Sequence, residues 1–444
     1  MKAKDHLLTV LILAGLVGGI LVGQLLLFNP NASAEAIAQT VQPWNDIGDL
    51  IFIRPLRMMI IPLVFISVVV GVTSIGDPQK LGLVGGATLL FYVTTMLLAV
   101  ILGLTIVNTI KPGAGIDPSQ FESAGQAAFE TKRVAIESGS AEGIGGAFMN
   151  LLYQMVPTNP ITAAVEGNTL GVVVFSILLG LALVMSGEPA RPVIRVFEGL
   201  FEALIKLVTW IIWIAPIGVF LLVAGRVGET GLSSLAGPIG LYALCVLLGL
   251  AIHAMVTLPA VLLAFGRTNP FRYMWQMRKP ILTAFSTASS SATLPITIEE
   301  AEKSGGCSKK AANFVLPLGA TVNMDGTALY QAVAVVFLFQ MFGLDLTLTQ
   351  QLVILITATL AAIGAAGIPS AGLVTMAIVI TAVNRSLGTV EGAEQLPMWT
   401  IGIILGVDRI LDMCRTAVNV WGDATGARIL TRFAPDDDDA PAAT

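Results

Sequence analysis

The sequence predicts an all-α polytopic membrane protein with eight transmembrane helices and two re-entrant helical hairpins, and three observations support this fold class. Hydrophobic residues make up 55% of the 444-residue chain and charged residues 12%, about half the charged share of soluble proteins. Mean hydropathy is +0.83, so a soluble chain of this length would lack the polar surface to cover itself. Apolar segments long enough to cross a bilayer recur along the chain, and the later ones are interrupted by Gly, Pro and Ser.

Six uninterrupted apolar segments come first along the chain. They lie at about residues 7–28, 47–76, 81–110, 160–186, 196–227 and 234–265. The first one follows Lys2 and Lys4 and precedes an Ala-Ser-Ala sequence, as the apolar part of a signal peptide would. It is longer, however, than the ~7–15 apolar residues of a signal peptide. We therefore interpret residues 7–28 as the first membrane helix.

The later apolar segments are broken. STASSSATLP interrupts residues 271–304, NMDGT interrupts residues 310–342, and IGAAGIPSAG interrupts residues 350–385, before a last span at 395–432. Half-segments of about 10–14 apolar residues are too short to cross a bilayer of about 30 Å. Two hairpin-like segments in corresponding positions around a broken helix indicate discontinuous helices that surround a site at the membrane midplane.

The distribution of Lys and Arg orients this topology. With eight spans, an internal N-terminus and hairpins that enter from opposite sides, about fourteen Lys and Arg residues face the cytoplasm and about five face outward. Cytoplasmic loops carry an excess of these residues. We therefore expect a multi-pass protein of the cell membrane, inner or plasma, with both termini in the cytoplasm.

The last span carries charges where hydrocarbon is expected, at Asp408, Asp412, Arg415 and Asp423, together with Asn419. At 100° per residue these positions fall within an arc of about 100°, so one face of the helix is polar. Four unpaired charges would cost roughly 10 kcal/mol in the membrane. One Arg cannot neutralise three carboxylates, which indicates that cations or a cationic ligand group complete the site. A structural polar network is the alternative, but it leaves excess negative charge unpaired.

The polar residues of the last span indicate the class of substrate. The planar guanidinium of Arg415 suits a carboxylate, and Asp412, one turn away, can accept hydrogen bonds from an ammonium group. The interruptions at 289–295 and 367–369 offer helix N-termini that suit a second carboxylate. An acidic amino acid carries all three groups. A C4-dicarboxylate would leave Asp412 without an ammonium group, and Arg415 disfavours a neutral amino acid.

Oxygen-bearing side chains in the broken helix indicate a cation site. Asn323 and Asp325 lie in an apolar run, and Gly326 weakens the helix there and exposes backbone carbonyls. Carboxylate, amide and carbonyl oxygens suit hard cations. Together with Asn419 and Asp423, this set predicts a sodium site, although the interruption taken alone could be a simple kink.

The sequence gives little support to other functions. It has no GxSxG, HExxH or Walker A motif and only two His residues, so we expect no enzyme. A pure ion channel would have no use for an amine-binding Asp beside a carboxylate-binding Arg. We also expect no organic cofactor and no nucleic-acid partner.

Four motifs resemble those of the dicarboxylate/amino acid:cation symporters, which include archaeal aspartate transporters and animal glutamate transporters. The motifs are SSSATLPIT, NMDGTALY, IGAAGIPSAGLVTM and DMCRTAVNVWGD, and the resemblance runs from residue 7 to 432. It implies a homotrimer that couples sodium influx to uptake of L-aspartate or L-glutamate by an elevator-type alternating-access mechanism. The alternative is a proton- or sodium-coupled C4-dicarboxylate symporter.

The resemblance also implies a division of the chain into a scaffold and a transport domain. Residues 1–80 would form scaffold helices 1 and 2, and residues 81–110 helix 3 of the transport domain. Residues 111–159 would form an external loop and residues 160–233 scaffold helices 4 and 5. Residues 234–432 would complete the transport domain with helix 6, hairpin 1, helix 7, hairpin 2 and helix 8, before an acidic cytoplasmic tail at 433–444.

Carried over position by position, the resemblance implies specific ligands. Substrate contacts fall on Ser290, Met324, Thr327, Ile368, Gly372, Asp412, Arg415, Thr416 and Asn419. One set of sodium ligands falls on Gly319, Asn323, Asn419 and Asp423. A second set falls on backbone oxygens around Thr321, Ala362, Ile363 and Ala365, and a third on Tyr92, Thr95, Asn323 and Asp325.

The chain departs from the family pattern at a few positions. Relatives carry a further Arg where this chain has Ala288 or Met413, and we expect Arg409, one turn before Met413, to take over its role. Met96 replaces a hydroxyl near the third sodium set. Gln331 stands where proton- and potassium-coupled animal members have Glu. A neutral amide cannot carry a proton, so we expect sodium coupling without potassium counter-transport.

Overall fold

The computed structural model describes residues 2–29, 32, 34–122, 125–130, 133, 143–231, 238–363, 365, 367, 371–387 and 395–436. The regular secondary structure in these ranges is helical throughout. The first half contains α1 (Lys2–Val22), η1 (Gly23–Leu27), α2 (Ala34–Gly48), η2 (Asp49–Ile53), α3 (Arg54–Ile75), α4 (Pro78–Ile110), η3 (Pro118–Phe121), α6 (Gly143–Met155), α7 (Pro160–Val165), α8 (Thr169–Ser186), η4 (Glu188–Ala190), α9 (Arg191–Ile212) and α10 (Ala215–Thr230).

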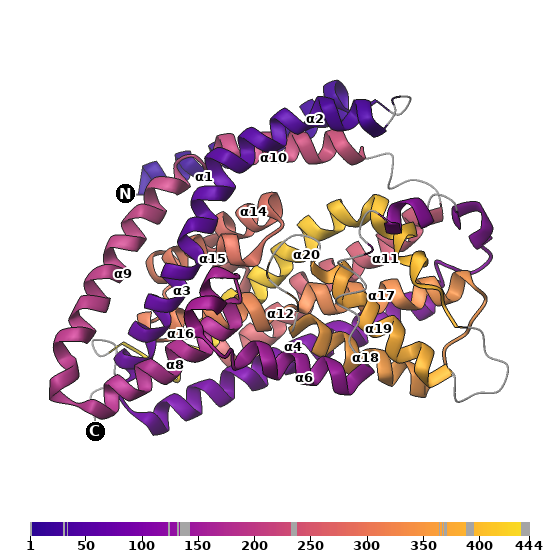
Figure 1. Cartoon of the computed structure of the whole chain (residues 1–444). Helices are drawn as coiled ribbons and strands as arrows, with labels where there is room; N and C mark the ends of the chain where they lie inside the picture. Colours follow the sequence, from indigo (N-terminus) through magenta and orange to yellow (C-terminus); the bar gives the residue numbers. More distant parts are fainter. Residues whose placement is uncertain are drawn as a thin grey trace.

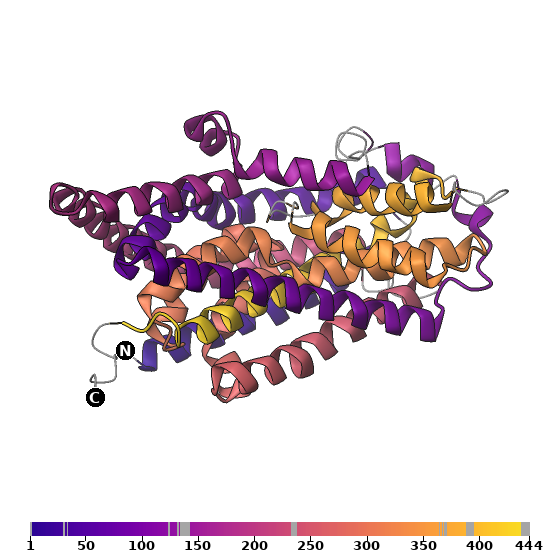
Figure 2. The ribbon, with the colours of Figure 1, turned by 90° about the horizontal axis from the view of Figure 1, so that it is seen from below.

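The second half begins with a helix that contains two π-helical turns. Its elements are α11 (Pro238–Ile252), η6 (His253–Thr257), α12 (Leu258–Val261), η7 (Leu262–Gly266), α13 (Pro270–Gln276), α14 (Arg278–Thr287), α15 (Ser290–Lys303), α16 (Lys309–Val322), α17 (Asp325–Met341), α18 (Leu348–Ile363), α19 (Ala371–Leu387), η8 (Met398–Thr400) and α20 (Ile401–Leu430). The beginning of α1 and the end of α20 lie at the same end of the molecule (Figures 1 and 2).

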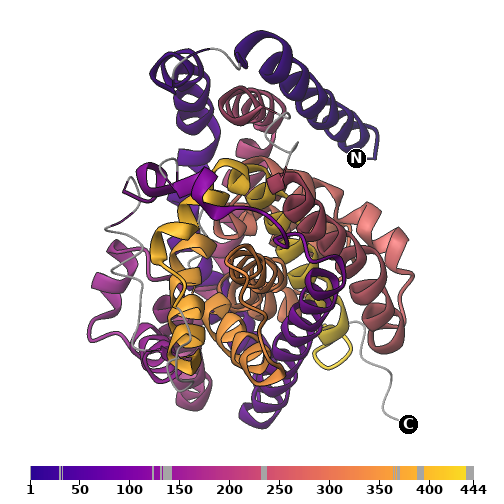
Figure 3. The same cartoon turned by 90° about the vertical axis from the view of Figure 1, so that its right-hand side faces the viewer.

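An outer group of helices lies along one side of the bundle. In this group α1 packs along α10, α2 also packs on α10, and α3 packs against α8 and α9 (Figures 1 and 3). Gly15 and Gly19 allow the close approach of α1, because a Cβ atom would lie 2.4 Å from the carbonyl oxygen of Pro216 and 2.8 Å from that of Phe220, respectively. Small residues four positions apart bring membrane helices together in this way.

The inner group contains the broken helices. Apart from its first two residues, Lys309 and Lys310, the segment formed by α16 and α17 is buried, and it packs against α4 and α20. The paired half-length helices α14 and α15, and likewise α18 and α19, pack against each other. The interruptions predicted at STASSSATLP and NMDGT are confirmed, because helix ends at Thr287 and Val322 and resumes at Ser290 and Asp325.

Helix length and composition support a multi-pass membrane protein. Within the described residues, six helical segments are long and apolar enough to cross a membrane, or seven if the bent pair Glu188–Ile212 and Ala215–Glu229 forms one span. With 30 residues, α20 is also long enough, although its polar face lowers its hydropathy. The membrane class is confirmed in this form, and the eight spans and re-entrant hairpins remain predictions.

Two predicted spans are less regular than expected. The segment at 160–186 is divided into α7 and α8, because Gly167 adopts a positive φ of 75° and Asn168 caps α8 by accepting from the Gly171 amide. The segment at 196–227 bends by 57° between α9 and α10, where Pro216 occupies the first turn of α10. Residues 111–159, predicted as an external loop, contain α6, which packs on α18 and α19.

Candidate functional site

The polar face of α20 points into the inner group of helices. The polar side chains of this face are each at most 3% exposed, namely Asp408, Asp412, Arg415, Asn419 and Asp423. Helices α11, α14, α16 and α17 pack around α20. Water is therefore excluded from a helix face that carries four ionisable groups, and each of them needs a partner there.

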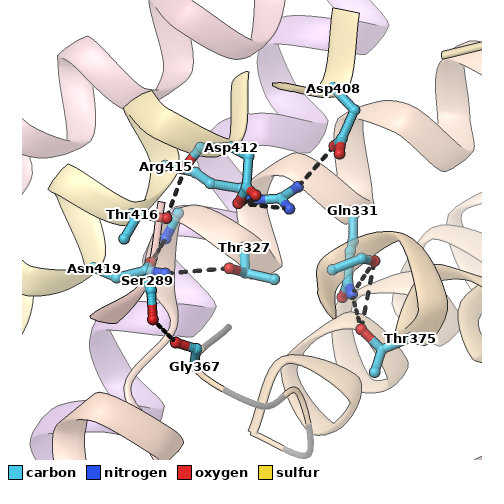
Figure 4. A network of polar contacts seen from close by, with 12 residues as sticks. Ser289, Thr327, Gln331, Gly367, Thr375, Asp408, Asp412, Arg415, Thr416 and Asn419 are labelled. Carbon is cyan, nitrogen blue, oxygen red and sulfur yellow. Dashed lines mark hydrogen bonds and ion pairs between the residues drawn. The ribbon is translucent and has the colours of Figure 1, made fainter. Parts of the chain in front are cut away.

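Arg415 is held between two carboxylates (Figure 4). Its Nε donates to Asp412 Oδ1 at 2.8 Å, and its Nη1 donates to Asp408 Oδ1 at 3.2 Å. Its Cζ also lies 4.3 Å from the centre of the Tyr330 ring, a cation–π contact. The guanidinium is thus fixed in position, and two negative charges surround one positive charge.

A small cavity of about 10 Å³, enough for about one water molecule, lies beside this ion-paired Arg. Eight of the nine predicted substrate contacts line it, namely Ser290, Met324, Thr327, Gly372, Asp412, Arg415, Thr416 and Asn419. The ninth, Ile368, lies outside the described residues. Ala288, Ala365 and Gly367 also line the cavity; no substrate contact was predicted for them. The four motifs, far apart in the chain, therefore meet around one space.

The interruption between α16 and α17 is fastened to α20. Asn419 Oδ1 accepts from the Gly326 amide at 2.7 Å, and Asn419 Nδ2 donates to Thr327 Oγ1 at 3.2 Å. A Cβ atom on Gly326 would lie 2.6 Å from the carbonyl oxygen of Arg415, so only glycine permits this approach. The Asn419 side chain thus provides an acceptor for the Gly326 amide, which lies in the first turn of α17 and has no intrahelical partner.

The tips of the two paired-helix segments touch each other. Ser289 Oγ accepts from the Ala292 amide, which caps α15, and donates to the carbonyl of Gly367 at 2.7 Å (Figure 4). The Ser291 amide donates to the same carbonyl at 3.2 Å. Ser290 is therefore the first residue of a helix whose N-terminus faces the cavity, a position suited to a carboxylate.

Gln331 connects α17 to the beginning of α19. Its Nε2 donates to the carbonyl of Gly372 at 3.0 Å and to Thr375 Oγ1 at 2.6 Å (Figure 4). Arg409 is half-buried and does not line the cavity beside Arg415. Whether Arg409 takes over the role of the missing second Arg remains a prediction.

A second polar cluster lies further along α20, around Asp423. Asn323 Nδ2 donates to Asp423 Oδ1 at 3.1 Å, and Thr95 Oγ1 donates to Asp325 Oδ1 at 3.0 Å and lies 3.3 Å from Asn323 Oδ1. All four side chains are at most 3% exposed. Among the ion pairs of the described chain, neither carboxylate has a Lys or Arg partner. The cluster therefore offers oxygen ligands and negative charge to a hard cation.

His253 contacts this cluster, a contact that the sequence did not predict. Its Nε2 lies 3.0 Å from Asp325 Oδ2, and both side chains are fully buried. The other ring nitrogen of His253, Nδ1, is buried without a hydrogen-bond partner among the described residues. No local pattern connects positions that are 72 residues apart, so only the tertiary structure reveals the pair.

The remaining predicted sodium ligands lie in two separate parts of the site. Tyr92 donates to the carbonyl of Val315 at 2.6 Å and lies beside Gly319, close to Asp423. Thr321, Ile363 and Ala365 line an adjoining pocket of about 240 Å³ together with Ser289, Ser291 and Gly367, among others. Ala362 is fully buried. The second predicted set therefore gathers near the hairpin tips.

Gly319 provides a test of the cluster around Asp423. A Cβ atom there would lie 2.5 Å from Asp423 Oδ1 and 2.8 Å from the Tyr92 hydroxyl, so we expect Gly319→Ala to destabilise the fold by about 1–3 kcal/mol. We also expect the variant to lose any rise in melting temperature that sodium chloride produces relative to choline chloride. Gly86→Ala is the matched control, because nothing lies within 4 Å of its Cβ position. A sodium-dependent rise in Gly319→Ala equal to that of the control would contradict the prediction.

Comparison with known proteins identifies relatives along nearly the whole chain. The sequence profile of the sodium:dicarboxylate symporter family matches residues 8–433. The neutral amino acid transporter B(0) of Homo sapiens is 38% identical, over 97% of this chain and 81% of the relative. The same transporter of Bos taurus is 37% identical, over 97% and 80%. Excitatory amino acid transporter 1 of Ambystoma tigrinum is 36% identical, over 86% and 76%.

Proposed function

The chain belongs to the sodium:dicarboxylate symporter family, and from this premise we propose that it couples sodium influx to the uptake of an acidic amino acid, L-aspartate or L-glutamate. The family and these relatives are transporters, so the prediction that the chain is not an enzyme is confirmed. The family and these relatives indicate sodium-coupled amino acid transport by a multi-pass membrane protein. The acidic substrate is our own inference from the site.

The observation that carries this proposal is the internal ion pair between Arg415 and Asp412 at the cavity wall. An acidic amino acid can insert into it: the substrate ammonium replaces the guanidinium at Asp412, and the side-chain carboxylate replaces Asp412 at Arg415. Asp412 and Arg415 then each keep a partner of opposite charge, which matters because an unpaired charge in a buried site costs several kcal/mol. The α-carboxylate can accept from the N-terminus of α15 at Ser290 and from Asn419 Nδ2.

Uptake of a neutral amino acid is the second candidate. It is favoured by the bovine and human relatives, which are neutral amino acid transporters by name, and by Asp408, which remains on Arg415 when Asp412 is released. Such a substrate would pair with Asp412 but would leave the Nε side of Arg415 without a carboxylate. A C4-dicarboxylate would have the opposite fault, because Asp412 would face no ammonium group.

We propose that the sodium ions bind at the cluster formed by Thr95, Asn323, Asp325 and Asp423 and at backbone oxygens near Thr321. The support is the pair of buried carboxylates described above, whose charge a monovalent cation would offset. The two binding sites are coupled because they share the interruption between α16 and α17. Asn323 and Met324 form the interruption, and Gly326 and Thr327, in the first turn of α17, bond to Asn419. Sodium that orders the interruption therefore also orders the substrate cavity.

We further propose the larger arrangement that the family implies. Residues 1–80 and 160–233 form the scaffold of a homotrimer, and residues 81–110 and 234–432 form a transport domain that moves as an elevator, with both chain ends in the cytoplasm. The separate outer and inner groups of helices and the location of both helical ends on one side support this proposal.

Uptake into proteoliposomes tests the proposed function. Vesicles that contain the purified chain are given labelled L-aspartate under imposed sodium, proton or potassium gradients, in competition with glutamate, succinate or serine. We expect accumulation only with an inward sodium gradient, and competition by glutamate but not by succinate or serine. Competition by serine would favour the neutral substrate, and uptake of labelled succinate would favour the C4-dicarboxylate.

Potassium provides a further prediction. Gln331 is a neutral amide engaged with Gly372 and Thr375, and it cannot exchange a proton for a cation as a carboxylate can. We expect the uptake rate to stay unchanged when internal potassium is replaced by choline at a fixed membrane potential. A rate that falls when potassium is removed would contradict this prediction.

A further inference from the structure

An apolar groove lies between the outer and inner groups of helices, away from the substrate cavity. Its volume is about 550 Å³, and it is lined by residues of α1, α11, η6, α13, α14 and α20. Its lining includes Leu13 of α1, Leu247 and Ala251 of α11, Phe285 of α14 and Cys414 of α20. None of these residues lines the cavity beside Arg415.

The groove lies beside two helices that are candidate membrane spans. Two of its walls belong to the candidate spans Leu7–Leu27 and Ile239–Gly266, and its rim residues Met255, Phe271 and Trp275 are exposed. An apolar space that opens to a bilayer is filled by hydrocarbon, since water finds no hydrogen-bond partners on such walls. The occupant of the groove is therefore an acyl chain.

The lining of the groove includes a cationic side chain. Arg278 is the single charged side chain among its described lining residues. The Arg278 Nε donates to Thr9 Oγ1 at 3.2 Å, its Nη1 donates to the carbonyl of Trp275 at 2.6 Å, and its Cζ lies 4.9 Å from the Trp275 ring centre. No carboxylate of the described chain forms an ion pair with it. An Arg beside an exposed Trp is typical of the membrane–water interface, where lipid phosphates lie.

We propose that this groove binds one anionic phospholipid, with an acyl chain along Leu247, Ala251 and Phe285 and the phosphate at the Arg278 guanidinium. The apolar walls require the chain, and the Arg278 cation, which forms no ion pair with a described carboxylate, selects a headgroup with net negative charge. The bound lipid contacts α1 on one side and α14 and α20 on the other, so it joins the two groups of helices. This site is independent of which amino acid the cavity accepts.

Native mass spectrometry of the purified full-length chain in detergent tests the site. The protein is titrated with dioleoyl phosphatidylglycerol or dioleoyl phosphatidylcholine, and the lipids retained per chain are counted. We expect one phosphatidylglycerol to bind about fivefold more tightly than phosphatidylcholine, the equivalent of ~1 kcal/mol for one cation at an anionic headgroup. Equal retention of the two lipids by the wild type would overturn the proposal.

Three variants locate the binding. Arg278→Gln is expected to equalise the two lipids. Ala251→Phe, which fills the groove, is expected to reduce retention of both, and it keeps the test open if the first variant folds poorly. The matched control Arg272→Gln, an exposed Arg outside the lining, is expected to keep the preference. Loss of the preference in Arg272→Gln, or full retention in Ala251→Phe, would show that lipids bind elsewhere.

Discussion

Replacing Arg415 with Gln is expected to weaken binding of L-aspartate by roughly a hundredfold or more, because removing one partner of a buried ion pair costs about 3–5 kcal/mol. Gln can still donate one hydrogen bond, but it cannot bind a carboxylate through two parallel bonds. The loss also leaves Asp408 and Asp412 facing each other without the cation that now lies between them. Isothermal titration calorimetry in saturating sodium measures the affinity directly.

The same variant separates an acidic from a neutral substrate. We expect Arg415→Gln to keep measurable affinity for serine or another neutral amino acid, since Asp412 can still accept from the ammonium group. Arg409→Gln is the comparison on the same helix; Arg409 lies outside the cavity lining, and we expect a smaller effect there. Aspartate affinity that is unchanged in Arg415→Gln would exclude this guanidinium as the carboxylate-binding group.

Replacing Asp423 with Asn is expected to raise the sodium concentration for half-maximal aspartate binding by about tenfold or more, since the number of charged ligands sets cation affinity over several orders of magnitude. The side-chain shape is kept, and the Asn oxygen can still accept from Asn323 Nδ2, which now donates to Asp423 Oδ1. The change therefore removes charge with little loss of packing. Aspartate binding titrated against sodium chloride, with choline chloride holding the ionic strength constant, gives the half-maximal concentration.

Asp345→Asn is the control for charge removal. Asp345 is 88% exposed and pairs only loosely with Lys111, at 3.8 Å, so we expect the same sodium dependence as in the wild type. If Asp423→Asn matched this control, the buried carboxylate would have no part in binding sodium.

The polar stripe of α20 and the helix interruptions follow from local patterns in the sequence. Spacing of three, four and seven residues places Asp408, Asp412 and Arg415 on one helix face, and the structure buries that face. Gly326 and the serines near Ser290 identify where helices must break, because glycine lowers helix stability and serine caps a new helix.

Contacts between distant segments could not be predicted in this way. The pairing of His253 with Asp325, the bond from Ser289 to Gly367 and the stacking of Arg415 on Tyr330 join residues that share no local period. They arise because each buried polar group takes whichever partner the packed helices bring within reach.

Breaks within otherwise apolar segments were also missed. The break at Gly167 and the bend before Pro216 lie in runs whose average hydropathy is that of a continuous span. Their signals were present, as a glycine beside the capping Asn168 and a proline inside the apolar segment, but they are short compared with the window over which hydropathy is averaged.

Calorimetric titration of the purified wild-type chain with L-aspartate, in sodium chloride and in choline chloride, tests most directly whether substrate and sodium together complete the charged face of α20. We expect strong binding in sodium, an affinity that rises steeply with sodium concentration, and no measurable heat in choline. Equal affinity in the two salts, or no binding of aspartate in sodium, would contradict the proposal that these two ligands complete the charged face of α20.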